Sequence, residues 1–167
     1  MANITLGGKP ATTNGELPVA GTSAPDFKLV NAADMAEVSL QNYAGKNIVM
    51  NIFPSVDTGV CATSVRKFNA EAANLQNTVV LCISKDLPFA MKRFCGAEGL
   101  NNVVTLSDFR NKGFSKTYGI EITSGAFEGL DARAVVVVGT DGKIKHTELV
   151  PEVGQEPNYT AALQALH

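Results

Sequence analysis

One of the three cysteines in this 167-residue chain stands in a segment that could make its thiol reactive. An apolar stretch ends at Pro54, a short polar loop follows, and apolar residues at steps of three and four then predict a helix over 61–76. A thiol at a helix N-terminus faces unpaired N–H groups and the positive end of the helix dipole, and both favour the nucleophilic thiolate. Thr58 lies three residues before Cys61, so its hydroxyl can turn toward the same sulfur. The alternative is an ordinary capped helix with a buried cysteine in its first turn, and position alone leaves both open.

Strand and helix patterns alternate along the chain on either side of this cysteine. Short apolar runs predict buried strands over 47–53, 78–84 and 133–138. Turn signals and periodicity add a hairpin over 4–16, strands over 103–106 and 143–150, and helices over 86–97, 111–118 and from Pro157 onward. In the helix over 86–97, Asp86 is the predicted N-cap and Pro88 lies in the first turn.

The order of these elements indicates the fold class. Alternating strands and helices, followed by a strand hairpin and a helix, predict a central mixed β-sheet flanked by helices. The thioredoxin fold has this order, and no internal repeat, low-complexity tract or linker interrupts it. We therefore expect an α/β chain with a thioredoxin-like fold, an N-terminal β-hairpin and a single domain over residues 1–167.

The composition argues against several classes of protein. With 14 Lys and Arg against 16 Asp and Glu, the net charge is −2, and without a dense basic tract no binding of nucleic acid is expected. Apolar runs such as 79–83 and 134–138 are far shorter than the about 20 residues of a membrane span. The first residues show no secretory signal, so a cytoplasmic location is expected. Three cysteines do not make a disulfide scaffold, and thiols in a reducing compartment are inert, metal-bound or catalytic.

Two sequence blocks resemble those of a known family. The spacing of Pro54, Thr58 and Cys61, Pro-x-x-x-Thr-x-x-Cys, is similar to the active-site signature of peroxiredoxins. The block over 84–95, SKDLPFAMKRFC, resembles the stretch that carries the resolving cysteine in bacterial thiol peroxidases, the atypical two-cysteine branch. The resemblance extends over nearly the whole chain, from the N-terminal hairpin to the last helix.

This resemblance implies roles for five residues. Cys61 would be the peroxidatic cysteine, Thr58 would hydrogen-bond its thiolate and the incoming peroxide oxygen, and Pro54 would shield the site from water. Arg133 matches the family arginine that stabilises the thiolate and the developing charge, and Cys95 matches the resolving cysteine. In a thioredoxin-like sheet the strand that Arg133 begins is antiparallel to the strand that ends at Pro54, which brings Arg133 beside Cys61.

The resemblance also implies a reaction without a cofactor. Hydrogen peroxide and alkyl hydroperoxides would be reduced to water or alcohols through a sulfenic acid on Cys61 and an intrachain disulfide between Cys61 and Cys95. Thioredoxin would reduce this disulfide, and the protein would form homodimers through surfaces next to the active site. Because Cys61 opens one helix and Cys95 closes another, their Cα atoms are not expected within the about 7 Å of a disulfide, and both helix ends would unwind in each cycle.

The other candidates have structural interpretations. Cys82 lies within an apolar run and is expected to be a small hydrophobic core residue. The three cysteines and His146 could supply four zinc ligands, but they lack the paired C-x-x-C arrangement, so no metal site is expected. Asp57 is expected in a solvated loop or against a neighbouring subunit, and His146 and His167 at the surface. Core positions are expected for the phenylalanines Phe27, Phe53, Phe89, Phe94, Phe109, Phe114 and Phe127.

Two other functions compete with a peroxidase. A thioredoxin-type disulfide oxidoreductase would use a C-x-x-C motif, whereas position 64, three residues after Cys61, is a serine. A peroxide-sensing thiol switch would pass its oxidation to a partner without turnover, and the sequence is compatible with that as an added role. Steady-state consumption of peroxide separates the enzyme from the sensor.

Overall fold

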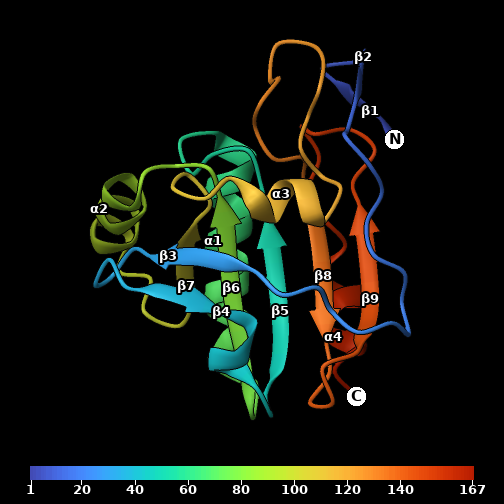
Figure 1. Cartoon of the computed structure of the whole chain (residues 1–167). Helices are drawn as coiled ribbons and strands as arrows, with labels where there is room; N and C mark the ends of the chain where they lie inside the picture. Colours follow the sequence, from blue (N-terminus) through green and yellow to red (C-terminus); the bar gives the residue numbers. More distant parts are fainter.

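Two β-sheets and their covering helices make up the computed structural model, which describes all residues from 1 to 167 (Figure 1). The strands are β1 (Asn3–Leu6), β2 (Lys9–Thr12), β3 (Lys28–Asn31), β4 (Glu37–Ser39), β5 (Asn47–Ile52), β6 (Thr78–Ser84), β7 (Val104–Ser107), β8 (Ala134–Val138) and β9 (Ile144–Leu149). The helices are η1, a 3-10 helix (Leu40–Tyr43), α1 (Gly59–Ala72), α2 (Pro88–Glu98), α3 (Gly113–Thr117) and α4 (Tyr159–Gln164). β1 and β2 form a separate antiparallel hairpin, and the other strands form one mixed sheet in the order β4-β3-β7-β6-β5-β8-β9.

The centre of the mixed sheet consists of three apolar strands. β5 pairs in parallel with β6 and antiparallel with β8. Successive residues of a strand point to opposite faces, so Ile48, Met50 and Ile52 of β5 join one core cluster, whereas Val49 joins the other. Because both faces are apolar, both must be covered.

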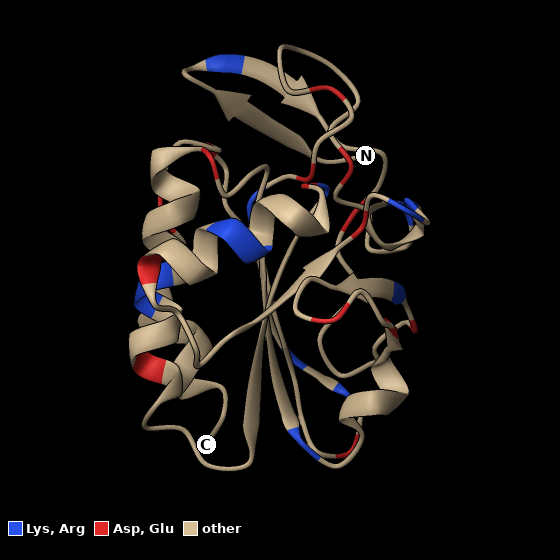
Figure 2. Cartoon of the chain, turned by 90° about the vertical axis from the view of Figure 1, so that its left-hand side faces the viewer, with Lys and Arg blue, Asp and Glu red and all other residues tan.

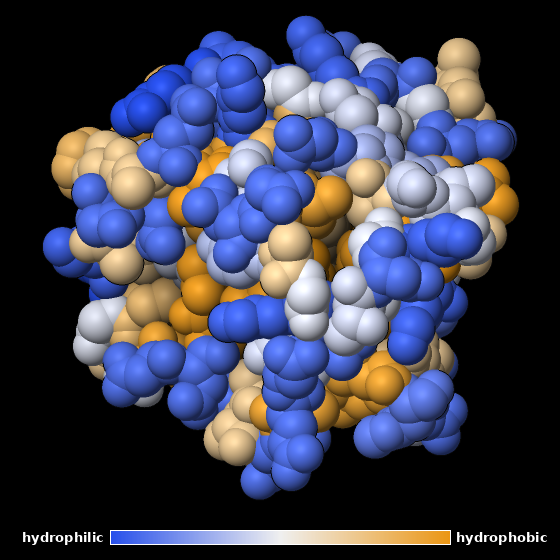
Figure 3. All heavy atoms as spheres, turned by 60° about the horizontal axis from the view of Figure 1, so that its bottom comes forward, coloured by the Kyte–Doolittle hydropathy of each residue, from blue (hydrophilic) through white to orange (hydrophobic).

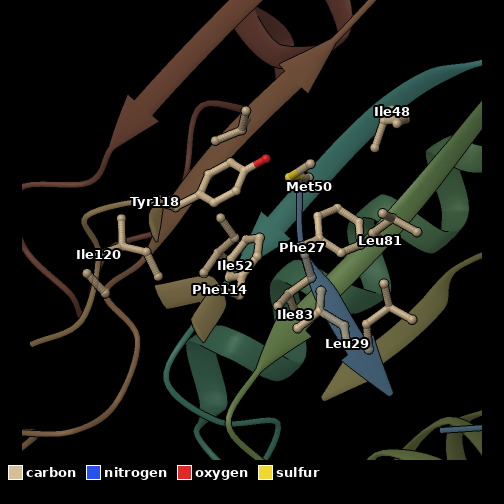
Figure 4. Close-up of a cluster of buried hydrophobic side chains, with 14 of the residues drawn as sticks. Phe27, Leu29, Ile48, Met50, Ile52, Leu81, Ile83, Phe114, Tyr118 and Ile120 are labelled. Atoms are coloured by element: carbon tan, nitrogen blue, oxygen red, sulfur yellow. The ribbon is translucent and has the colours of Figure 1, made fainter. Parts of the chain in front are cut away.

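The first cluster lies on the side of the sheet that faces the viewer in Figure 1, where α3 crosses in front of the strands. Figure 4 shows Phe27 and Phe114 packed over Met50 and Ile52 of β5. The rings of Phe114 and Tyr118 are stacked with their centroids 4.4 Å apart, and Phe27 meets Phe114 edge-on at 5.9 Å. These aromatic pairs fix α3 to the sheet.

The second cluster lies on the opposite face, beneath α1, α2 and α4. α1 contributes Cys61, Val65 and Phe68, and α2 contributes Phe94. The ring of Phe68 meets that of Tyr159 edge-on, with centroids 5.1 Å apart, which fixes α4 against α1. Cys95 of α2 packs against the same cluster, so both helices with candidate cysteines share one core.

The structure confirms the expected thioredoxin-like fold with its mixed sheet, flanking helices and N-terminal hairpin. β6 matches its predicted range, and the helix over 61–76 corresponds to α1. β3, β4 and η1 were not predicted. They contain three or four residues each, and no residue of β4 or η1 is buried, so they show no apolar run or alternation.

The predicted starts of two helices were wrong. Asp86 does not cap α2, whose N-cap is Leu87 without a side-chain hydrogen bond. The Asp86 carboxylate instead accepts hydrogen bonds from Ser55, Val56 and Ser84. The last helix does not open at Pro157, because the Asn158 side chain accepts from the N–H of Ala161 and makes Asn158 the N-cap of α4.

Basic and acidic residues are interspersed along α1 and α2 on the face shown in Figure 2. Arg66 pairs with Glu98 at 2.8 Å, and Arg93 pairs with Asp57 at 3.4 Å. The side chains of both pairs are exposed to solvent, so they contribute little to stability. None of the helices has both the length and the apolar character that crossing a membrane requires.

A cavity of about 430 Å³ lies where β5 begins and where β8 turns into β9. Its apolar lining includes Leu40, Tyr43, Ile48 and Val138. Figure 3, which brings this end of the molecule forward, shows hydrophobic atoms in a hollow among hydrophilic ones. None of the candidate site residues lines this cavity, and Pro54, Cys61 and Arg133 lie toward the other end of β5.

Candidate active site

The antiparallel pairing of β5 and β8 brings Arg133 to the end of β5. Ile52 of β5 lies opposite Ala134 of β8, so the residue before Ala134 stands next to the loop that starts with Phe53 and Pro54. The N-terminus of α1 follows this loop (Figure 1). Two segments far apart in sequence therefore meet where β5 ends and β8 begins, as the strand directions predicted.

Arg133 is buried, with 2% of its surface exposed. Its Nη2 donates a hydrogen bond to the Sγ of Cys61 at 3.1 Å, and its Nε donates to the carbonyl of Val153 at 2.7 Å. Its Nη1 is buried and has no acceptor in the protein. A buried guanidinium is stable only when its polar groups are paired, and here the Cys61 sulfur and the Val153 carbonyl are its partners. Nη1 remains as a buried donor group without a protein acceptor.

Cys61 is the third residue of α1 and is fully buried. The N-cap of the helix is Thr58, in an extended conformation. At this position the helix dipole adds to the attraction of Arg133 for a thiolate. The Oγ of Ser64, itself buried, donates to the Cys61 carbonyl at 2.7 Å and accepts from the amide of Asn51 at 3.1 Å, so this turn is also fixed to β5.

The structure places Pro54 and Thr58 beside Cys61 in the chain but does not join Thr58 to the sulfur. Pro54 is buried and Thr58 is half-buried. The Thr58 hydroxyl donates to the carbonyl of Ser55 at 3.2 Å, and the Thr58 N–H donates to the same carbonyl at 3.2 Å. The hydroxyl oxygen retains its lone pairs, and its hydrogen can turn when a substrate enters.

Cys95 lies in the last turn of α2 and is not near the start of that helix. It is seven residues beyond Pro88, about 10 Å along a helix axis. The side chain is half-buried, and burial raises the pKa of its thiol, while a hydrogen bond with Thr105 opposes this shift. All three cysteines are free thiols in this structure. The structure therefore brings Pro54, Thr58, Cys61 and Arg133 together, whereas Cys95 lies in the last turn of α2 and forms no disulfide with Cys61.

Cys82 occupies the interior of β6 and has no exposed surface. Burial raises the pKa of its thiol to about 12, so the thiol stays protonated. The amide nitrogen of Asn51 donates a long hydrogen bond, 3.8 Å, to its sulfur. The structure thus confirms the expected core position of Cys82.

Replacing Cys82 with serine is expected to leave peroxide turnover within about twofold of wild type, because the thiol faces the core and not the site. The hydroxyl is smaller and more polar than the thiol that it replaces in this apolar position, so the change should lower the free energy of unfolding by about 1–3 kcal/mol. Parallel measurements of turnover and of denaturant unfolding check both statements. Loss of turnover in a folded variant would show that Cys82 takes part in the reaction.

The structure bears on three further sequence interpretations. Asp57 is 65% exposed at its side chain and pairs with Arg93, so it lies at the surface of the chain and does not face the sulfur, and a contact with a neighbouring subunit stays a prediction. His146 is half-buried rather than at the surface, because β9 packs beside β8, and its Nε2 is enclosed without a partner. Phe89 and Phe109 are 68% and 48% exposed, which corrects their expected core positions.

Sequence reasoning missed two groups that support the site. The Val153 carbonyl, which orients Arg133, lies in a loop after β9, and any residue type could supply it. Asp86 was interpreted as a helix cap, but it binds the loop over residues 53–58 between β5 and α1, called the active-site loop below. An acidic side chain two residues before Pro88 fits both roles, and only the folded chain shows which of them it takes.

Comparisons with known proteins agree with this geometry. The model of the Redoxin family matches residues 19–163. Thiol peroxidases of Mycobacterium bovis and Mycobacterium tuberculosis are each 55% identical over 166 residues, 99% of this chain and 99% of theirs. The solved structure of a peroxiredoxin-like protein from Aquifex aeolicus has a TM-score of 0.92 at 36% identity, covering 99% of this chain and 96% of that one.

A more distant structure shows the same fold. A thiol peroxidase from Chromobacterium violaceum has a TM-score of 0.89 at 20% identity, covering 97% of this chain and 93% of that one. The full-length match in sequence and the family model agree with the peroxiredoxin signature around Cys61. The chain therefore belongs to the thiol peroxidases of the Redoxin family, which are peroxiredoxin-type oxidoreductases.

Proposed function

We propose that this peroxidase reduces hydrogen peroxide and alkyl hydroperoxides at Cys61 and completes its cycle through an intrachain disulfide with Cys95. The observation that carries the proposal is the buried guanidinium of Arg133, which donates to the Cys61 sulfur at 3.1 Å and keeps Nη1 free. This arrangement stabilises the nucleophile and offers a donor to the oxygen that it attacks.

In the first step the Cys61 thiolate attacks the terminal oxygen of the hydroperoxide. The sulfur–oxygen bond forms as the oxygen–oxygen bond breaks, and Cys61 becomes a sulfenic acid. The departing alkoxide or hydroxide takes up a proton from solvent and leaves as alcohol or water. Nη1 of Arg133 and the hydroxyl of Thr58 would donate to the oxygens where charge develops, and the buried Pro54 limits access of water.

In the second step the Cys95 thiol condenses with the sulfenic acid. A sulfur–sulfur bond forms, and the sulfenic hydroxyl leaves as water with the thiol proton. Cys95 lies toward the far end of α2, so the first turn of α1 and the end of α2 would have to unwind. The αL glycine Gly99, which caps α2, makes that end less costly to open.

In the third step a dithiol protein of the thioredoxin type would reduce the disulfide by thiol–disulfide exchange, returning both cysteines to thiols. A coupled assay tests the whole cycle: reduced thioredoxin, its reductase and NADPH, with hydrogen peroxide or cumene hydroperoxide as substrate. NADPH consumption that depends on both peroxide and this protein supports the proposal. Oxidation of Cys61 without turnover would favour the thiol switch, the second candidate function.

We further propose that the protein forms a homodimer through an apolar surface made of Leu87, Phe89 and Phe109. Their exposed fractions are 47%, 68% and 48%. The surface adjoins the active-site loop, because Asp86 binds Ser55 and precedes Leu87. Phe109 is linked to the same segment, because its N–H donates to the Ser107 hydroxyl, which donates to the Asp86 carbonyl. Exposed large apolar side chains that lie together mark protein contacts.

Replacing Phe89 with aspartate is expected to convert the dimer to a monomer at micromolar concentration, because a charge would be buried in the contact. Light scattering coupled to size-exclusion chromatography measures the mass. Val19→Asp is the matched control, since Val19 is 71% exposed on a separate loop and should leave the dimer intact. A dimeric Phe89→Asp variant would rule out this surface.

A further inference from the structure

Asp86 joins the active-site loop to the segment between β6 and α2. Its Oδ1 accepts a hydrogen bond from the Ser55 hydroxyl at 2.7 Å, and its Oδ2 accepts from the Val56 N–H at 2.8 Å. The Oδ2 also accepts from the Ser84 hydroxyl at 2.6 Å. Hydrogen bonds to an ionised carboxylate are about twice as strong as those between neutral groups.

One end of this connection is fixed to the sheet. Ser84 of β6 lies opposite Ser107 of β7, and both are buried. The Ser84 hydroxyl binds the Asp86 carboxylate, and the Ser107 hydroxyl donates to the Asp86 carbonyl. The next residue, Leu87, is the N-cap of α2. Asp86 is therefore anchored at the junction between the rigid sheet and the helix that carries Cys95.

The other end leads to Cys61. Ser55, which donates to Asp86, accepts at its carbonyl from the N–H and the hydroxyl of Thr58. Thr58 is the N-cap of α1, so its position sets the first turn of that helix and with it Cys61. Val56, whose N–H binds Asp86, is 2% exposed and packs in the same core cluster as Cys61.

We propose that Asp86 is a positioning residue that latches the active-site loop in the peroxide-reactive arrangement, and that release of its bonds to Ser55 and Val56 precedes disulfide formation. This inference rests on the proposed Cys61–Cys95 cycle. The latched loop holds Thr58 and Cys61 for reaction with peroxide. The released loop lets the first turn of α1 open so that Cys61 can reach Cys95.

Replacing Asp86 with asparagine tests the latch. The amide oxygen can still accept from the Val56 N–H and the NH₂ group can donate to the Ser55 hydroxyl, but the negative charge is lost and both bonds to the loop become neutral ones. We expect the reaction of Cys61 with peroxide to slow about tenfold, because charge-assisted hydrogen bonds are replaced by weaker ones. Disulfide formation from the sulfenic acid should speed up about threefold or more, because the loop opens more readily. With excess peroxide, less sulfinic acid should form at Cys61.

The experiment is a rapid-quench time course on the full-length reduced protein with one equivalent of cumene hydroperoxide. Dimedone traps the sulfenic acid, N-ethylmaleimide caps free thiols, and intact mass gives the fraction of thiol, sulfenic acid and disulfide at each time. Asp57→Asn is the matched control, because Asp57 is an exposed loop carboxylate that pairs only with Arg93. In this variant the rates of Cys61 oxidation and of disulfide formation should both stay within about twofold of wild type.

Ser55→Ala provides a second variant, which removes one donor and leaves the Asp86 carboxylate intact. In this variant oxidation of Cys61 should slow and disulfide formation should speed up, as in Asp86→Asn but by a smaller factor. If both reactions slow in Asp86→Asn and Ser55→Ala, or if neither rate changes, Asp86 is not a latch. If wild type itself forms no Cys61–Cys95 disulfide, the proposed cycle fails instead, and the two failures are distinct.

Discussion

Replacing Arg133 with methionine is expected to slow the reaction of Cys61 with hydroperoxide by about 10²–10³-fold. The change removes the donor to the Cys61 sulfur and the unpaired Nη1, the donor proposed for the peroxide oxygen. Methionine has a similar length and an apolar end, so the buried volume stays filled. Single-turnover kinetics with the reduced variant measure this step without the reductant.

Arg133→Lys separates charge from geometry. Lysine keeps the positive charge but lacks the planar fork that lets Arg133 donate to Val153 and Cys61 together. We expect its rate to fall between those of wild type and Arg133→Met. A rate for Arg133→Met within about tenfold of wild type, in a folded protein, would mean that the guanidinium does not stabilise the reacting sulfur.

Replacing Cys95 with serine is expected to abolish steady-state turnover with thioredoxin while leaving the first turnover nearly unchanged. Cys95 is half-buried toward the end of α2 and makes no hydrogen bond to Cys61, so peroxide should still oxidise Cys61 at close to the wild-type rate. Without a resolving thiol the sulfenic acid persists, and further peroxide carries it to sulfinic acid. Intact mass should show one added oxygen and later two.

Cys82→Ser is the control for Cys95→Ser, since it removes a thiol from the core and leaves the proposed pair in place. If Cys95→Ser turned over with thioredoxin at the wild-type rate, the reductant would act on the Cys61 sulfenic acid itself, and Cys95 would have no resolving role.

The central strands of the fold could be predicted because their sequences are continuous apolar runs. β5, β6 and β8 are almost wholly buried, and apart from Asn51 and Ser84 their buried residues are apolar. β3 could not be found in this way, because it joins the sheet through a partner far along the chain, where Val30 lies opposite Ser107 of β7. β4 pairs only with the neighbouring β3, and its three residues are too few to show a strand period.

The site was predictable where family motifs and strand directions agree. Arg133 and Cys61 are separated by 72 positions, and only the antiparallel pairing of β5 and β8 relates them. Asp86 shows the limit of local rules. An acidic residue before a proline at a helix start indicates a cap, but partners about 30 positions away in the active-site loop bind its carboxylate more favourably than the helix N-terminus does. The Thr58 hydroxyl likewise donates to the Ser55 carbonyl in this structure, and not to the Cys61 sulfur as expected from the sequence.

A single turnover with mass mapping tests the two-cysteine cycle itself. The fully reduced protein receives one equivalent of cumene hydroperoxide, is alkylated and digested, and the linked peptides are identified. We predict one disulfide, between Cys61 and Cys95 within one chain, with Cys82 recovered as an alkylated thiol. A persistent sulfenic acid at Cys61 without that link would remove the role of Cys95, and an unoxidised Cys61 would contradict peroxide chemistry at this site.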